Sequence, residues 1–133
     1  MIEPQEAFLM FEKWHSERTR LLCIGAFYGW NLQSQGRIST LSNQEIQIDF
    51  LDTLGRIVLR LDQEDLGFEY AEPKDAKPDV RKLVPGYARD LGTLLVALPL
   101  RLTLSQFQSS QVPAREKLFF MEVPEGGFPP DPL

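Results

Sequence analysis

The stretch EIQIDFLDTLGRIVLRLD, which runs from Glu45 to Asp62, carries the most regular hydrophobic pattern in the chain. Its two halves alternate apolar and polar residues with a period of two, which is typical of a strand with one buried face. The residues on the apolar side are Ile46, Ile48, Phe50, Ile57, Leu59 and Leu61. The stretch therefore predicts a β-hairpin of an antiparallel sheet whose apolar side faces a core.

Two registers of this hairpin keep the apolar residues on one side, because the registers differ by two residues and the side-chain period is also two. The first has a four-residue loop, 52–55, and sets Phe50 opposite Ile57. The second has a two-residue loop that asks the β-branched Thr53 for a positive φ, which is unfavourable. We predict the first register, since Gly55 at the end of its loop supplies the backbone freedom that the turn needs.

The polar side of the hairpin carries charges of both signs. The predicted register sets Gln47 opposite Arg60 and Glu45 opposite Asp62, and Arg60 can reach Asp49 or Glu45 diagonally. Cross-strand pairs of this kind stabilise a solvent-exposed sheet face by ~0.2–1 kcal/mol each. A binding site for an ion would be more one-sided, so we interpret this face as scaffold.

A helix and two strands are expected before the hairpin. Residues 3–19 predict an amphipathic helix, with Pro4 at a position where its missing N–H costs nothing. The apolar stripe of this helix consists of Ala7, Phe8, Phe11 and Trp14. Residues 20–33 are largely apolar on both strand faces, which predicts one central strand. A turn at 33–36 then leads into a second strand at 36–42.

Three further strands are expected after the hairpin, around residues 66–71, 93–107 and 117–123. Pro99 lies inside the second of these and needs an edge position or a bulge. A long leucine-rich edge strand is prone to aggregation unless something covers it. The pattern therefore predicts either a dimer or cover from the C-terminal segment.

Together these elements predict an α+β fold, in which an N-terminal helix packs on a bent, mostly antiparallel sheet of six or seven strands or a partly open barrel. We expect residues 1–123 to form a single domain. Residues 124–133 are expected to form a proline-rich flexible tail. The charged stretch 72–82 has no strand pattern and predicts a loop.

Composition narrows the classes of partner. The 14 Lys and Arg are outnumbered by 19 Asp and Glu, and the net charge is −5. Phosphate backbones and anionic lipids repel such a chain, so we expect no nucleic acid and no membrane partner. Cys23 is the single cysteine, which excludes an internal disulfide. With neither a signal-peptide pattern nor a membrane-spanning apolar run, we expect a cytoplasmic protein.

Sequence motifs of the common enzyme classes are missing. The chain has no phosphate-binding glycine loop, no GxSxG and no HExxH. His15 is the only histidine, and together with Glu12 it offers too few ligands to retain a metal. We expect no metal, no cofactor and no catalytic residue. The remaining enzymatic alternative is a hydrolase or isomerase that uses Glu12, His15 or Asp49.

For function, we expect a small binding or interaction domain that self-associates or binds a protein partner. The alternative is a small-ligand-binding barrel with a pocket beneath the bent sheet. Glycines of the first strand would form the floor of this pocket, and aromatic side chains would form its walls. The residues of this hypothetical pocket are Trp14, Gly25, Tyr28, Gly29, Trp30 and Tyr70.

Overall fold

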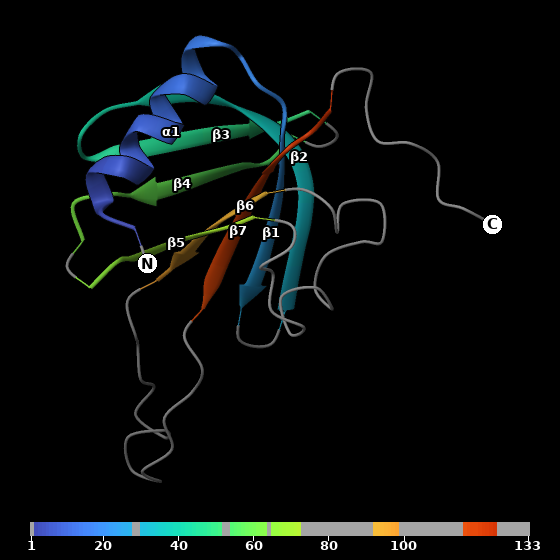
Figure 1. Ribbon diagram of the computed structural model, residues 1–133. Helices are drawn as coiled ribbons and strands as arrows, with labels where there is room; N and C mark the ends of the chain where they lie inside the picture. The colour runs from blue at the N-terminus through green and yellow to red at the C-terminus, as the bar shows by residue number, and fades with distance from the viewer. Residues whose placement is uncertain are drawn as a thin grey trace, which may run out of the picture.

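The computed structural model describes residues 2–27, 30–51, 54–63, 65–72, 92–98 and 116–124 (Figure 1). For residues 26, 27, 30 and 31 it describes the backbone only. These parts of the chain form one helix, α1 (Pro4–Ser16), and seven strands. The strands are β1 (Leu21–Phe27), β2 (Trp30–Leu41), β3 (Glu45–Phe50), β4 (Arg56–Arg60), β5 (Gly67–Ala71), β6 (Thr93–Ala97) and β7 (Lys117–Glu122).

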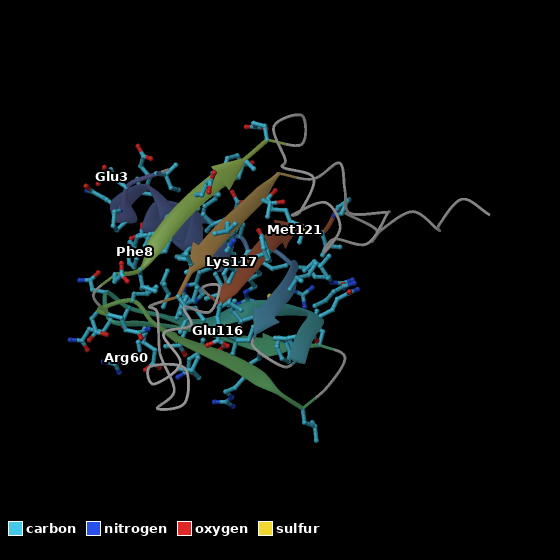
Figure 2. The ribbon with its side chains drawn as sticks, turned by 90° about the horizontal axis from the view of Figure 1, so that it is seen from below. Glu3, Phe8, Arg60, Glu116, Lys117 and Met121 are labelled. Carbon is cyan, nitrogen blue, oxygen red and sulfur yellow. The ribbon has the colours of Figure 1, made fainter. Side chains whose placement is uncertain are left out.

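All seven strands belong to one antiparallel sheet with the order β4-β3-β2-β1-β7-β6-β5. The sheet curls into a half-barrel, and α1 lies across its concave side (Figure 1). Seen from below, β4 and β5 form the opposite edges of the curl (Figure 2). The predicted α+β class, with an N-terminal helix on a bent antiparallel sheet, is confirmed.

The core fills the space between α1 and the concave side of the sheet. From α1 it takes Ala7, Phe11 and Trp14, whose spacing of four and three residues places them on one face of the helix. The ring of Phe11 makes edge-to-face contacts with Trp14 and with Phe120 of β7, each at 5.9 Å between ring centroids. Burial of these large aromatic side chains anchors the helix to the sheet.

The helix is shorter than predicted and ends at Ser16. Arg18 adopts a left-handed backbone with φ 53°. Its N–H donates to the His15 carbonyl at 3.3 Å, and the Thr19 N–H donates to the Trp14 carbonyl at 3.0 Å. These bonds satisfy the last helical carbonyls and turn the chain toward β1, which ends the helix before residue 19.

The prediction of a single strand over residues 20–33 is wrong. The chain reverses after Phe27, which pairs with Trp30, and β2 then continues through residues 33–36, where a turn was expected. The expected central position is confirmed, because β1 is the fourth of the seven strands. Both faces of β1 are buried at Leu21, Leu22, Cys23 and Ile24.

The predicted register of the opening hairpin is also wrong. Ile46 pairs with Leu59 and Ile48 with Ile57, which is the register with the shorter loop. The shift of two residues leaves every side chain on its predicted face, so Ile46, Ile48 and Leu59 are buried as expected. The apolar pattern alone cannot separate the two registers, since it repeats every two residues.

The polar side of β3 and β4 is a mixed-charge face, although its predicted partners change with the register. Glu45 lies opposite Arg60, and Asp49 lies opposite Arg56. Arg60 contacts Asp62 at 2.9 Å and Glu45 at 3.4 Å, and Arg56 lies 3.5 Å from Asp49. Figure 2 shows Arg60 at the β4 edge of the sheet.

The last three strands match their predicted positions within the described residues. Strand β6 lies between β5 and β7, so residues 93–97 do not form a sheet edge. Strand β7 is the covering C-terminal segment that the sequence suggested, and this removes the edge argument for a dimer at 93–97. Pro99, the rest of the predicted strand to residue 107, the stretch 73–82 and the tail 125–133 lie outside the described residues.

Candidate functional site

Among the described residues, two hollows lie between α1 and the sheet. One lies toward the β3–β4 hairpin and will be called the α1 groove; the other lies toward β5, β6 and β7 and will be called the Trp14 hollow. The α1 groove has a volume of about 460 Å³, and the Trp14 hollow has a volume of about 240 Å³. The larger hollow opens where the two edges of the half-barrel, β4 and β5, fail to meet.

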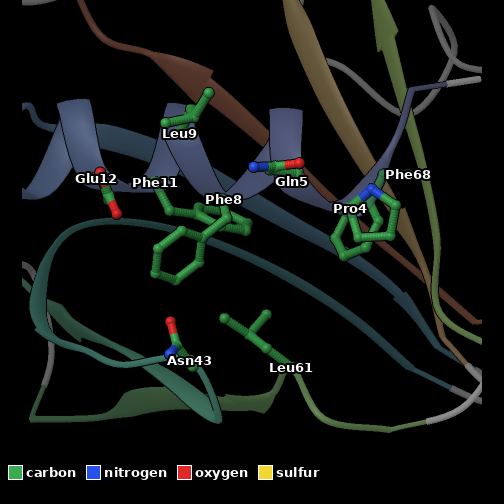
Figure 3. Close-up of a pocket in the computed structure, with 9 residues that line it drawn as sticks. All are labelled: Pro4, Gln5, Phe8, Leu9, Phe11, Glu12, Asn43, Leu61 and Phe68. Atoms are coloured by element: carbon green, nitrogen blue, oxygen red, sulfur yellow. The ribbon is translucent and has the colours of Figure 1, made fainter.

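The α1 groove is assembled from distant parts of the chain (Figure 3). Its described lining comprises Pro4, Gln5, Phe8, Leu9, Phe11, Glu12, Asn43, Leu61 and Phe68. Phe11 and Phe68 are buried and form the floor, with exposed fractions of 1% and 6%. Phe8 is half-buried, and its ring points from the helix toward Leu61 and Asn43 (Figure 3). The floor and walls of the groove are therefore apolar.

Backbone hydrogen bonds hold the walls of the α1 groove together. The Leu61 N–H donates to the Gln44 carbonyl at 2.8 Å, which ties the end of β4 to the turn that carries Asn43. In that turn, the Ser42 hydroxyl oxygen accepts from the Gln44 N–H at 3.2 Å, a common use of serine in turns. On the other wall, the Ile2 N–H donates to the Phe68 carbonyl at 3.0 Å. Backbone hydrogen bonds of the fold therefore fix both walls of the groove.

The rim of the α1 groove is polar and comes from Gln5, Glu12 and Asn43. All three side chains are exposed. Glu12 leaves α1 on the same side as Phe8, four residues earlier, as expected for neighbours on one helix face (Figure 3). An apolar interior with a few polar groups at its mouth is the usual composition of a small-molecule pocket.

The Trp14 hollow is smaller and is tied by side-chain contacts. The Trp14 indole Nε1 donates to Glu122 Oε1 at 2.6 Å, which satisfies a buried donor. Burial raises the pKa of the Tyr70 hydroxyl, and the charges of Glu72 and Glu122 raise it further. A Cβ at position 92 would collide with the Tyr70 hydroxyl, so the present position of the Tyr70 side chain depends on Gly92.

The residues of the pocket predicted from sequence are only partly placed together. Trp14 and Tyr70 line the Trp14 hollow. Gly25 is buried within β1, where it pairs with Leu32 and Leu118. Trp30 has a described backbone that pairs with Phe27, while its side chain, with Tyr28 and Gly29, lies outside the described residues.

Sequence reasoning missed the α1 groove. Phe8 was assigned to the buried stripe of the helix, and Leu61 was assigned to the hairpin core. The signal that could have pointed to the groove is the width of the apolar stripe. Phe8 and Phe11 together place more aromatic surface on α1 than one row of contacts can bury, and Phe8 remains half-buried.

Two of the three residues of the enzymatic alternative lie together. Glu12 and His15 are exposed on α1 and line one shallow surface depression, and Glu12 also lies at the rim of the α1 groove. Asp49 faces Arg56 on the sheet at 3.5 Å. Within the described ranges, no three His, Cys, Asp or Glu residues come close enough to hold a metal ion. In the same ranges, no helix is long and apolar enough to cross a membrane.

Comparison of the chain with protein-family models, with curated proteins and with solved structures finds no match. The functional argument therefore depends on the geometry of the hollows beside α1.

Proposed function

We propose that this protein is a non-catalytic binding domain that holds a small molecule with an apolar body in the α1 groove. The observation that supports this most directly is a hollow of about 460 Å³ with an apolar interior, at the seam where the sheet stays open. Ligand pockets typically have volumes of roughly 300–1,000 Å³ and often occupy the mouths of β-barrels.

The walls of the groove are ordered without a ligand, which also supports the proposal. The bonds from Leu61 to Gln44 and from Ile2 to Phe68 fix both walls without a ligand. A ligand would therefore lose its own freedom on binding but would not have to order the walls. The groove also exposes Phe8 to solvent at its mouth, and an apolar ligand would cover that surface.

The experiment is a thermal-shift and native mass spectrometry screen of small apolar metabolites, repeated on two tryptophan variants. Leu61→Trp fills the groove, whereas Val58→Trp places the same side chain on an exposed position of β4 outside the groove. We expect Leu61→Trp to weaken any hit by at least about tenfold, or about 1.4 kcal/mol. Val58→Trp should leave the affinity unchanged. A screen without hits, or equal losses in both variants, would contradict the proposal.

Self-association is a second candidate function, favoured by exposed aliphatic side chains on the β3–β4 hairpin. Leu51 and Val58 are about half exposed and Leu54 is fully exposed. By strand alternation and pairing, all three lie on the outer face of the hairpin. Sedimentation velocity over a range of concentrations tests this candidate, and a monomer at every concentration would remove it.

We propose the cytoplasm as the location of the protein. The support is compositional: the chain has a single cysteine, Cys23, and that residue is buried in β1.

A further inference from the structure

We infer that the ligand of the α1 groove carries a cationic, hydrogen-bond-donating head, such as a primary ammonium group, which binds at the Glu12 end. This inference rests on the proposed function and adds the charge of the ligand to it. It follows from the ionisable groups that line and surround the groove.

Glu12 gives the described lining of the groove its charge. Among the described residues that line the groove, it alone has an ionisable side chain. Within the described part of the chain it forms no ion pair. A carboxylate accepts hydrogen bonds and cannot donate them, so it matches an ammonium group and repels a carboxylate.

The other end of the groove does not offset this preference. The first turn of α1 lies beside Pro4, and the free N–H groups of a helix start normally favour an anion. Here Glu3 and Glu6 already place two carboxylates at that turn. The Glu3 carbonyl also accepts from the N–H groups of Glu6 and Ala7, at 3.0 and 3.2 Å. These carboxylates do not line the groove, but they offset the positive end of the helix beside it, so the helix start does not favour an anionic ligand.

In the described part of the chain, the two cations next in sequence to residues of the groove do not line it. Arg60 directly precedes Leu61, but its guanidinium contacts Asp62 at 2.9 Å and Glu45 at 3.4 Å. Lys13 follows Glu12 on the helix and shares a shallow surface depression with it and with His15, but it lines the Trp14 hollow and not the α1 groove. Neither side chain is placed to hold an anion in the groove.

The two neutral rim residues are compatible with the same head group. The side-chain amides of Asn43 and Gln5 each offer a carbonyl oxygen that can accept from an ammonium. An ammonium has three donors, so one head can bind the Glu12 carboxylate and still use an amide oxygen. The apolar body then lies against Phe8, Phe68 and Leu61.

The test compares three probes with the same six-carbon chain: hexylammonium, 1-hexanol and hexanoate. Their binding is measured by two-dimensional NMR titration of the full chain at low ionic strength. We expect hexylammonium to bind about threefold more tightly than hexanol, which suits an exposed carboxylate, and hexanoate to bind most weakly. Raising the salt concentration should reduce the preference, because exposed charges are screened.

Two variants of equal net charge serve as a matched pair. Glu12→Gln should abolish the preference for hexylammonium over hexanol, whereas Glu17→Gln, at the end of the same helix and outside the groove, should preserve it. Equal binding of hexylammonium and hexanol at Phe8 and Leu61 would overturn the inference and leave the proposed function standing. The absence of binding by all three probes, or binding that Leu61→Trp does not block, would overturn both.

Discussion

The two flanks of α1 differ in how fully their aromatic side chains are buried. On one flank, Trp14 is 3% exposed and donates its indole hydrogen bond to Glu122. On the other flank, Phe8 stays half-buried above a hollow of about 460 Å³. Both residues are aromatic and both lie toward the sheet, so residue type does not explain the difference.

The difference lies in what faces the helix. The Trp14 flank meets the continuous ladder of β5, β6 and β7, in which Glu122 of β7 accepts the indole hydrogen bond. The Phe8 flank meets the seam between β4 and β5, where Leu61, Phe68 and the turn at Asn43 line the hollow. A curled sheet that stops short of closure thus leaves a larger hollow on one side of its covering helix, about 460 Å³, than on the other, about 240 Å³.

The largest expected effect separates the two flanks by stability. Trp14→Ala should lower the free energy of unfolding by about 3–5 kcal/mol, the usual loss for a buried aromatic side chain. Phe8→Ala should cost roughly 1–2 kcal/mol, because much of its ring already faces solvent. Urea denaturation of both variants measures the two losses. Equal losses would show that the groove side is packed like the other flank, and the comparison would fail.

A smaller effect isolates the hydrogen bond on the packed flank. Glu122→Ala removes the acceptor of the Trp14 indole and should cost about 1–2 kcal/mol. Glu122→Gln keeps a side-chain oxygen at that place and should recover part of the loss. The denaturation midpoints of the two variants and of the parent protein measure these losses. Identical midpoints would mean that the hydrogen bond from the indole contributes nothing measurable to stability.

The smallest effect is a change with pH at Tyr70. Burial and the nearby carboxylates raise the pKa of its hydroxyl, so the folded state keeps the proton to a higher pH than the unfolded chain does. This contribution to stability is complete below the ordinary pKa of about 10 and is lost as the pH rises through the raised value. Tyr70→Phe should flatten that alkaline loss. An ultraviolet titration should also show one late tyrosine that the variant lacks.

Sequence patterns predicted the fold class because alternation marks strand faces directly. The buried faces of β3 and β4 follow from Ile46, Ile48 and Leu59, and the helix follows from the spacing of Phe11 and Trp14. The hairpin register escaped prediction, since a shift by two residues moves no side chain to another face. The reversal after Phe27 was missed because residues 20–33 are largely apolar throughout, so alternation does not mark a strand end there.

The α1 groove escaped prediction for another reason. It depends on the distance between β4 and β5, two strands that never pair with each other. Neither the composition of the chain nor its hydrophobic periodicity predicts the distance between these two strands. Only the turn signal at residues 42–44 and the broad aromatic face of α1 hint at the groove.

The central position of β1 has a consequence for the order in which the sheet can be completed. One edge of β1 pairs with β2, its neighbour in sequence, while the other pairs with β7, with Leu21 opposite Glu122. On the ribosome, strands β1 to β4 can pair as they emerge, but the second edge of β1 must wait until β7 has been made. Until then its apolar residues stay available to other chains, which favours aggregation of the nascent protein.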